Sequence, residues 1–417
     1  MTVFHIVGAG LAGLSAAVRL GQAGKRVVLY EAADHAGGRC RSYLDATLGQ
    51  RVDNGNHLLF RGNRAALRYL QTIGAVGHFI CPHEPAFPFV DLETGARWVV
   101  RLNGGLFPWW ILSPSRRIPG TKAADYLTAL RLFTAPRQAT VAETFADGGP
   151  LYRYFWEPLA VASLNTPAER GALRLLLPVV LRVFGKGREA ARPMVARDGL
   201  SESFMDPALD FLRKKEATVR FTHRLRGIGF ANAAASALDF GERRVDLGKD
   251  DRLILAVPPG NAADLLPGLT CPQAYEPILN AHFQLPEAPA WPHETPFIGV
   301  VGGLAQWVFL RGRIASVTVS AAGAHIDAAP EALIPRLWSD VARALQLPET
   351  SPPPCRVIKE RRATFSQTPS ALAQRPKTRT AYANLFLAGD WTDTGLPATI
   401  ESAIFSGHLA ATAAMKR

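Results

Sequence analysis

Three glycines near the start of the chain, and one acidic residue after them, have the spacing of a dinucleotide-binding site. Gly8, Gly10 and Gly13 lie in the stretch IVGAGLAG, and Glu31 follows at the end of the next apolar run. In this fingerprint the first glycine permits a tight turn, the second lets the backbone approach a pyrophosphate, and the third lets a helix pack closely on a strand. Glu31 is then placed to accept hydrogen bonds from the hydroxyls of an adenosine ribose.

The elements that must position these residues can be predicted from the surrounding pattern. Residues 3–7 are apolar and partly β-branched, which indicates a buried strand, and residues 14–23 have the pattern of a helix that ends at Gly24. The stretch RVVLYE predicts a second strand. A strand–turn–helix–strand unit of about thirty residues is what the fingerprint requires, and its helix N-terminus offers free N–H groups to phosphates. The alternative is a glycine-rich turn in an α/β protein that binds no nucleotide.

The residues after the acid indicate which dinucleotide is bound. Gly37, Gly38 and Arg39 follow in EAADHAGGRCRS, and such a GGR motif resembles the two-dinucleotide-binding-domain flavoproteins, in which it lies near the pyrophosphate. The resemblance implies FAD rather than NAD. Further on, VDNGNHLLF (residues 52–60) is rich in turn-forming residues and is predicted to be a loop, with Gly55 allowing close approach of the backbone. In a flavoprotein this loop would pass the isoalloxazine ring; otherwise it is a surface hairpin.

A second glycine-bearing strand-to-helix turn lies at the end of the chain. NLFLAGD predicts a buried strand that ends at Gly389 and Asp390, and PATIESAIFSG predicts a helix that begins near Pro397. The N-terminus of that helix would stabilise the negative charge of a reduced flavin, and Asp390 would bind the ribityl hydroxyls. The two ends of the chain would therefore hold the two halves of one FAD molecule, unless the last helix only completes the core.

Composition narrows the classes of partner. The chain has 417 residues, a net charge of +12, four cysteines without a CxxC pair and ten histidines without a metal-ligand spacing. We therefore predict no metal site and no disulfide framework, and the cytoplasm as the compartment. The excess of positive charge favours an anionic partner. Because the basic residues are dispersed and no nucleic-acid-binding motif accompanies them, an anionic membrane surface is favoured and no nucleic acid is expected.

The pattern along the chain predicts an α/β fold of two interleaved domains. A Rossmann-like FAD-binding domain, of the two-dinucleotide-binding-domain type, is assigned to residues 1–73, 196–264 and 350–417. A mixed α+β substrate-binding domain is assigned to residues 74–195 and 265–349, where WVFLRGRIASVTVSAAG alternates as antiparallel strands do. The FAD-binding domain is therefore expected to be discontinuous in sequence.

Two stretches of the substrate domain are candidates for membrane contact. LFPWWILSPSRR (residues 106–117) combines two tryptophans and aliphatic residues with two arginines, the mixture of an interfacial anchor, and LRLLLPVVLRVFGKGR (residues 173–188) is the second candidate. Both could instead belong to the core. No apolar run of about 18 residues predicts a transmembrane helix. The expected location is the cytoplasm, with peripheral attachment to the inner face of the cell membrane.

Taken together, the motifs resemble the amine oxidase and phytoene desaturase superfamily of FAD enzymes, and within it the hydroxysqualene dehydroxylases. FWEPLAVASLNTP (residues 155–167), GLSESFMDPAL (residues 199–209) and LAVPPGNAADLLP (residues 255–267) extend the likeness over most of the chain. The resemblance implies FAD binding by Gly8, Gly10, Leu11, Ala12, Gly13, Glu31, Arg39, Gly55, Asn56, Leu225, Asp390, Thr399 and Ile400, to which the glycine motifs add Gly38 and Gly389.

The same resemblance implies a reductive reaction on a polyprenoid, the conversion of hydroxysqualene to squalene in hopanoid biosynthesis. An allylic alcohol loses water when an acid protonates its hydroxyl, and reduced flavin can then deliver hydride to the delocalised cation. His57 is the candidate proton donor, with Asp53 as its orienting partner; alternatively, His57 only bonds the backbone of its loop. Where amine oxidases place an aromatic residue before the last helix, this chain has Leu396, Pro397 and Ala398, which favours an aliphatic substrate.

Other activities on this scaffold stay open at the level of sequence. A carotenoid or polyprenoid desaturase, or an amine oxidase, would run electrons in the opposite direction, and flavin chemistry is reversible. A prenyl-lipid escort without enzymatic activity shares the fold but needs no ribityl-binding Asp390. No second dinucleotide fingerprint for NADPH is visible, so an external electron donor or reductase is expected to reduce the flavin.

Overall fold

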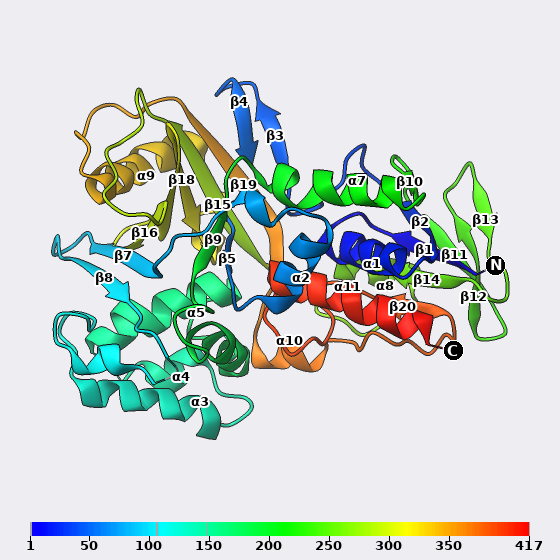
Figure 1. The fold of residues 1–417 in the computed structure, drawn as a ribbon, viewed down its shortest axis with the longest axis horizontal. Coiled ribbons are helices and arrows are strands. Elements are labelled where there is room, and N and C mark those ends of the chain that lie inside the picture. The colour runs from blue at the N-terminus through cyan, green and yellow to red at the C-terminus, as the bar shows by residue number, and fades with distance from the viewer. Residues whose placement is uncertain (1, 106, 148, 417) are drawn as a thin grey trace.

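A computed structural model describes residues 2–105, 107–147 and 149–416, in which two large β-sheets lie at opposite ends of an elongated molecule (Figure 1). The first is a parallel sheet of five strands, and both chain termini lie at its end of the molecule. Its strands, in spatial order, are β10 (Thr218–Arg220), β2 (Arg26–Tyr30), β1 (Val3–Val7), β14 (Arg252–Leu255) and β20 (Leu385–Leu387). All of them come from residues predicted for the FAD-binding domain.

Both faces of the parallel sheet are covered, because its strands send alternate apolar side chains to opposite faces. Phe4 and Ile6 of β1 face one side, whereas Leu253 and Leu255 of β14 face the other. The first side packs against α1 (Leu11–Gln22), α2 (Arg64–Thr72), α7 (Asp206–Lys214) and α11 (Ile400–Met415). The second packs against α8 (Pro259–Leu265) and an antiparallel sheet of β11 (Gly227–Ala231), β12 (Ala234–Asp239) and β13 (Arg244–Asp246).

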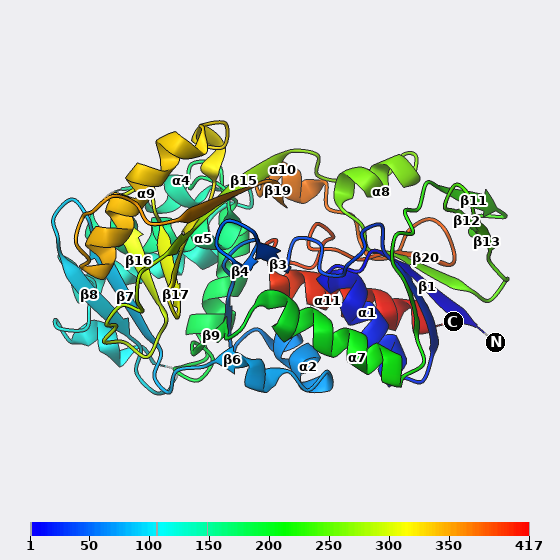
Figure 2. The same ribbon diagram turned by 90° about the horizontal axis from the view of Figure 1, so that it is seen from above.

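Helices α1 and α11 lie side by side in both ribbon views (Figures 1 and 2). A Cβ atom on Gly407 of α11 would stand 2.1 Å from the carbonyl oxygen of Ala12 in α1, so only glycine permits helices this close. The Ser15 hydroxyl donates to the carbonyl of Ile404 at 3.0 Å across the same contact. Because β1 and β20 run parallel, both helices begin at the carboxyl edge of the sheet, where the two glycine-bearing turns become neighbours.

The second large sheet is antiparallel except for the pairing of β16 with β7. Its seven strands, in spatial order, are β19 (Cys355–Phe365), β15 (Tyr275–Gln284), β18 (Ile314–Val319), β17 (Trp307–Arg311), β16 (Phe297–Val301), β7 (Ala86–Asp91) and β8 (Arg97–Arg101). Ile298 and Val308 pack against α9 (Pro330–Leu345) on one face, and Phe297 and Phe309 project from the other. That other face is covered by α3 (Arg131–Thr134), α4 (Val141–Phe145), α5 (Glu157–Leu164) and α6 (Leu176–Val179).

Smaller elements lie between these halves. Strand β3 (Ser42–Asp45) pairs with β4 (Gln50–Asp53), and β9 (Pro193–Ala196) lies between β5 (Leu58–Phe60) and β6 (Phe79–Ile80), with α10 (Pro369–Ala373) below them in Figure 1. The short 3₁₀ helices are η1 (Val76–His78), η2 (Trp109–Leu112), η3 (Ala123–Leu130), η5 (Leu173–Leu175) and η8 (Ala322–Ala324). The π-helical turns are η4 (Tyr152–Trp156), η6 (Val180–Phe184) and η7 (Ser201–Met205).

The predicted helices exist, but their starting points are corrected. Helix α1 begins at Leu11 rather than at residue 14, because Gly10 already holds the extended N-cap position with ψ 178°. Helix α11 begins at Ile400 rather than near Pro397, because the Thr399 side chain accepts a hydrogen bond from the N–H of Ser402 and so caps the helix there.

Two further expectations are corrected by the strands. The stretch predicted as one loop, residues 52–60, contains the end of β4 and all of β5, so its irregular part is only residues 54–57. Residues 350–417 were assigned to the FAD-binding domain, but β19 within them belongs to the seven-stranded sheet. It pairs with β15 along most of its length. Its run of charged residues gave no sign of this pairing in the sequence. The division into two domains otherwise stays a prediction.

Candidate active site

In the first glycine turn, Gly8 and Gly13 are required by the packing of the protein itself, whereas Gly10 is not. Gly8 has φ +104°, and a Cβ there would lie 2.5 Å from the carbonyl oxygen of Ala256. A Cβ on Gly13 would lie 1.8 Å from the carbonyl oxygen of Gly8, so α1 could not pack on β1 with any larger residue. A Cβ on Gly10 would meet no protein atom closer than 3.9 Å. Gly10 therefore leaves open space at the N-terminus of α1.

A loop and a carboxylate flank this open space. The Gly37 N–H donates to the Ala9 carbonyl at 2.9 Å, and Gly37 forms an isolated parallel bridge with Gly10, so the GGR loop lies against the glycine turn. Glu31 follows β2 and accepts from the N–H of Ala9 at 2.6 Å and of Ala33 at 2.9 Å. Since an ionised carboxylate offers about four acceptor positions, Glu31 keeps capacity for the hydroxyls of a ligand.

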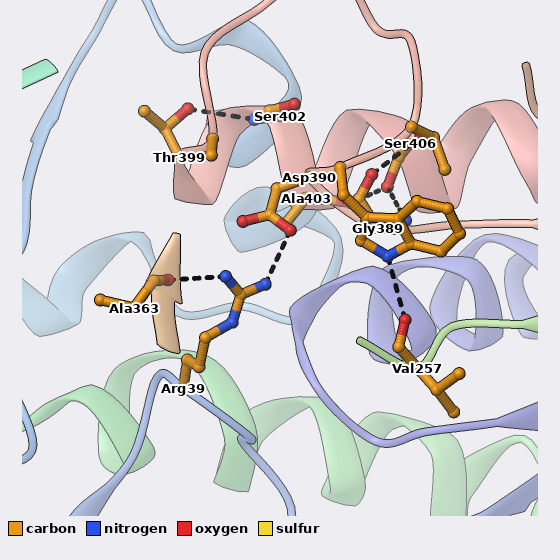
Figure 3. Close-up of polar contacts among 12 residues, drawn as sticks. Arg39, Val257, Ala363, Gly389, Asp390, Thr399, Ser402, Ala403 and Ser406 are labelled. Atoms are coloured by element: carbon orange, nitrogen blue, oxygen red, sulfur yellow. Dashed lines mark hydrogen bonds and ion pairs between the residues drawn. The ribbon is translucent and has the colours of Figure 1, made fainter. Parts of the chain in front are cut away.

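An ion pair ties the two ends of the chain together. The Arg39 guanidinium donates from Nη2 to Oδ1 of Asp390 at 2.7 Å and from Nη1 to the carbonyl of Ala363 at 2.7 Å (Figure 3). Burial lowers the pKa of Arg39, but the negative charges around it, chiefly that of Asp390, outweigh this effect and raise the pKa, so the guanidinium stays charged. The loop after Glu31 and the turn before α11 are thereby held at one site.

The second glycine turn presents the N-terminus of α11. Gly389 has φ +149°, and its N–H donates to the Ser406 hydroxyl at 2.8 Å (Figure 3). Thr399 caps the helix through Ser402, which leaves the N–H groups of the first turn, those of Ile400 and Glu401, without an acceptor inside the helix. These groups and the helix dipole make a site for negative charge.

Glu401 fixes this turn relative to α2. Its buried carboxylate accepts from the N–H of Ala65 at 3.1 Å and of Ala66 at 2.8 Å, which are the first-turn donors of α2. Burial raises the pKa of Glu401, and these hydrogen bonds and the nearby Arg182 counteract that rise. The start of α11 is thus attached to a second helix as well as to the sheet.

The loop that carries the candidate proton donor rests on β15 and β18. The Nε2 atom of His282 lies 2.9 Å from the carbonyl oxygen of Asp53 and must donate to it, so Nδ1 accepts from the Ser316 hydroxyl at 2.7 Å. Asn280 donates to the carbonyl of Asn54 at 3.3 Å. Burial lowers the pKa of His282 to about 4, which keeps it neutral in this role.

In the described part of the chain, the hydrogen bonds of the Asp53 side chain go to residues other than His57, its predicted partner. The Asp53 carboxylate accepts from the Ser42 hydroxyl at 2.6 Å and the Leu200 N–H at 2.9 Å, and forms an ion pair with Arg311; no hydrogen bond joins it to His57. Asp53 is a buried carboxylate at the end of β4, and these nearer donors satisfy it. Through these contacts Asp53 holds the loop in place, and an orienting effect on the imidazole stays a prediction.

His57 lines a small cavity. The half-buried side chain borders a space of about 20 Å³ together with Leu200, Phe309 and Ser316. Burial lowers the pKa of His57, an effect that the Asp53 charge opposes and the Arg39 charge reinforces. The imidazole therefore faces a space bordered both by apolar side chains, such as Leu200 and Phe309, and by the polar side chains of Asp53, Asn56 and Arg311.

The other predicted cofactor residues fall around the same site. Leu11 and Ala12 are buried in the first turn of α1, and Asn56 donates to the Thr318 hydroxyl at 3.0 Å. Gly55 lies against Asn280, with 3.2 Å between a Cβ built on it and the amide nitrogen, so its close approach is to the sheet. Leu225 packs in the apolar cluster that contains Tyr30 at the end of β2, on the Glu31 side of the site.

The polar side chains beneath the loop were not predicted from sequence. Asn280 and His282 lie two residues apart on β15, opposite Thr318 and Ser316 of β18, so all four project from one face of the sheet. The available signal was the recurrence of polar residues at every second position of otherwise apolar strands.

These features fit FAD. The open space at Gly10, the free donors of α1 and the Glu31 carboxylate match the pyrophosphate and ribose of a dinucleotide, and the start of α11 with Asp390 matches a second, anionic part of the same molecule. No group of three metal-ligating side chains comes together in residues 2–105, 107–147 and 149–416.

Comparison with known proteins defines the class. The family model of flavin-containing amine oxidoreductases matches residues 11–415. A solved structure of putrescine oxidase superposes with a TM-score of 0.70 at 17% identity, over 100% of this chain and 99% of that one. The chain belongs to the flavin-containing amine oxidoreductase family, and it is an FAD-dependent oxidoreductase with the α/β fold of that family.

Two curated relatives narrow the class to one family. Hydroxysqualene dehydroxylase of Rhodopseudomonas palustris is 44% identical over 408 residues, which are 98% of this chain and 97% of that protein. Hydroxysqualene dehydroxylase of Zymomonas mobilis is 44% identical over 415 residues, which are 100% of this chain and 99% of that protein. Within the flavin-containing amine oxidoreductases, the chain belongs to the hydroxysqualene dehydroxylase family.

Proposed function

We propose that this protein reduces hydroxysqualene to squalene in hopanoid biosynthesis, with FAD as its redox cofactor. The observation that carries the proposal is the identity of 44% over nearly the whole chain to two hydroxysqualene dehydroxylases, which includes both glycine turns and the middle of the molecule. The turn before α11 supports it, because Leu396 and Ala398 are buried aliphatic residues and offer no aromatic cage for an amine.

The surroundings of His57 suit a long hydrocarbon. A row of aromatic rings leads away from its cavity: Phe309 contacts Phe297 with 5.6 Å between ring centroids, Phe297 contacts Phe87 at 6.2 Å, and Phe87 contacts Phe60 at 6.2 Å. Phe87, Phe297 and Phe309 belong to the face of the seven-stranded sheet that α3 to α6 cover, and Phe60 of β5 packs against the same apolar cluster. An apolar wall of this kind would bind a polyprenoid and keep water away from a reacting cation.

The reaction requires one proton, which must reach the hydroxyl oxygen of the substrate. The carbon–oxygen bond of the allylic alcohol breaks, the oxygen leaves as water after it takes up a proton, and the carbon gains a hydrogen. Bound reduced FAD supplies the two electrons and that hydrogen. We assign the proton delivery to the imidazole of His57, which borders the cavity, while Asp53 and Arg311 hold its loop. Because the pKa of His57 is lowered, only a minor fraction carries the proton at neutral pH.

The partners that we propose are an anionic membrane surface and an external electron donor. The net charge of +12 favours the membrane surface, with the protein on the cytoplasmic side of the cell membrane. The external electron donor is favoured because the sequence has no second dinucleotide fingerprint. Rapid bleaching of the purified protein by NADPH alone would refute an external donor.

Product analysis tests the proposed direction of the reaction. Purified holoprotein is supplied with an artificial reductant and hydroxysqualene in detergent under anaerobic conditions, and the extracted lipids are separated by gas chromatography with mass detection. Squalene is the expected product. A product that has gained a double bond, formed only when the flavin starts oxidised, would instead identify a desaturase.

A further inference from the structure

Large apolar side chains are exposed mainly in one region of the molecule. Nine such side chains are exposed in the described residues, and six of them lie between residues 107 and 133. The six are Phe107, Trp109, Leu112, Leu127, Leu130 and Phe133. This set, which we call the apolar patch, lies at the end of the molecule remote from both termini, around α3 in Figure 1.

Helix geometry places three of these residues in a row. In a 3₁₀ helix, residues three apart stand above one another, so Leu127 and Leu130 of η3 form a stripe that Phe133 of α3 continues. The inner side of η3 is fixed, because the Tyr126 hydroxyl accepts from the N–H of Ile118 at 3.0 Å. The stripe therefore points outward on a helix whose other side is packed.

The short helix η2, which precedes η3, likewise has one buried and one exposed side. Trp110 is buried and packs edge-on against Tyr126 with 5.3 Å between ring centroids, whereas Trp109 is 60% exposed and contacts Phe107 at 4.3 Å. Trp110 thus anchors the turn that holds Trp109 at the surface. The first predicted membrane segment is corrected in part by this arrangement, since one tryptophan belongs to the core; its first residue, Leu106, lies outside the described residues.

The charges in the stretch that carries the apolar patch are mostly positive, although Arg131 forms an ion pair with Asp147, just beyond that stretch, at 2.6 Å. Residues 101–140 contain one acidic residue, Asp125, whose carboxylate accepts from the backbone N–H of Lys122 at 2.8 Å. The basic residues of the same stretch are Arg101, Arg116, Arg117, Lys122, Arg131 and Arg137. A second copy of the chain would bring like charge against like charge, whereas an anionic lipid surface complements it.

We infer that the apolar patch docks on an anionic lipid bilayer, with Leu127, Leu130 and Phe133 inserted among the lipids and the neighbouring basic residues at the headgroups. None of the helices in the described ranges is long and apolar enough to cross a membrane. The segment of residues 173–188 offers a smaller apolar surface, because Leu173, Leu176 and Val183 are buried and Leu181 is its one exposed large apolar side chain among the described residues. The inference deepens the proposed function, since a substrate of hydrocarbon character resides in the bilayer.

Flotation of the full-length holoprotein with lipid vesicles tests this surface. The vesicles contain phosphatidylcholine alone or with about 30% phosphatidylglycerol, to supply the anionic charge. The triple variant Leu127→Gln/Leu130→Gln/Phe133→Gln is compared with Leu44→Gln, a control at a leucine that is 71% exposed on β3. The wild type and the control should float with anionic vesicles, and the triple variant should bind roughly a hundredfold more weakly.

Three results would overturn the inference. They are a triple variant that floats like the wild type, a wild type that floats with neither vesicle, and a wild-type dimer in sedimentation that the triple variant lacks, which would identify a second copy as the occupant. The flavin spectrum and turnover of hydroxysqualene in detergent are measured on the same samples. Vesicle binding without turnover would leave the surface in place and reject the substrate, so the two proposals fail separately.

Discussion

Two substitutions in the first glycine turn should separate cofactor binding from folding. In Gly10→Ala, the new methyl group meets no protein atom closer than 3.9 Å and the backbone, at φ −72° and ψ 178°, suits alanine. In Gly13→Ala, the methyl group would stand 1.8 Å from the Gly8 carbonyl oxygen, so α1 must move away from β1. The first change should act on the ligand, and the second on the protein.

The two variants are expected to differ in stability. In Gly10→Ala, the lower entropy of the unfolded chain is stabilising, but alanine is a poorer N-cap than glycine, and Gly10 is the N-cap of α1. These two effects are similar in size and opposite in sign, so the free energy of unfolding of the flavin-free Gly10→Ala protein should stay within about 1 kcal/mol of the wild type. Because its methyl group occupies the space assigned to the pyrophosphate, FAD affinity should fall tenfold or more, which is about 1.4 kcal/mol. Gly13→Ala should lower the free energy of unfolding by about 3 kcal/mol through overpacking, and weaken FAD as a consequence.

Urea unfolding of the flavin-free proteins, followed by circular dichroism, gives the free energies, and titration of flavin fluorescence gives the affinities. Gly24→Ala is unsuitable as a control because Gly24 has φ +66°; Gly77→Ala has open space and serves better. The placement of FAD at Gly10 is refuted if Gly10→Ala binds FAD like the wild type. A Gly10→Ala protein as destabilised as Gly13→Ala would contradict the geometry of the turn.

Three further side chains give predictions of their own. His57→Gln should keep the flavin spectrum but lower kcat about a hundredfold or more. Because the reaction needs the protonated imidazole and burial puts the pKa of His57 below 6.5, wild-type kcat/KM should fall as the pH rises through that lowered pKa. The variant should lose this pH dependence. Asp390→Asn should leave Arg39 without its counter-charge, lowering the free energy of unfolding in urea by about 1 to 3 kcal/mol and loosening FAD on gel filtration. The pKa of His282 is 6.5 in the unfolded chain and about 4 in the folded protein, so the unfolded state takes up the proton first as the pH falls. The free energy of unfolding should therefore decline by up to about 3 kcal/mol between pH 6.5 and pH 4. Urea unfolding at a series of pH values measures this decline, and His282→Gln should reduce it.

The ends of the chain could be predicted from sequence because their constraints are local. Gly8, Gly10 and Gly13 act within a single strand–turn–helix unit, and the turn at Gly389 lies between a buried strand and a helix, so spacing alone indicated both. The alternation of residues 307–319 likewise fits two strands, which the structure contains as β17 and β18.

The contacts that depend on distant parts of the chain could not be predicted in this way. Asp53 was paired with His57 because they are close in sequence, but its carboxylate is satisfied by Arg311, which lies 258 residues away. Arg39 and Asp390 were each assigned to the cofactor, and their ion pair spans 351 residues. Likewise, the outward stripe from Leu127 to Phe133 depends on which side of η3 the rest of the protein covers.

The direction of electron flow is the central claim, and a single anaerobic mixing experiment tests it most directly. Photoreduced holoprotein is mixed with hydroxysqualene in detergent in a stopped-flow spectrometer, and hydrocarbon is extracted from the same reaction. We expect the absorbance of oxidised flavin to return with formation of one squalene per flavin. Flavin that stays reduced in the presence of the alcohol, or oxidised flavin that the alcohol bleaches, would contradict a reductive dehydroxylase.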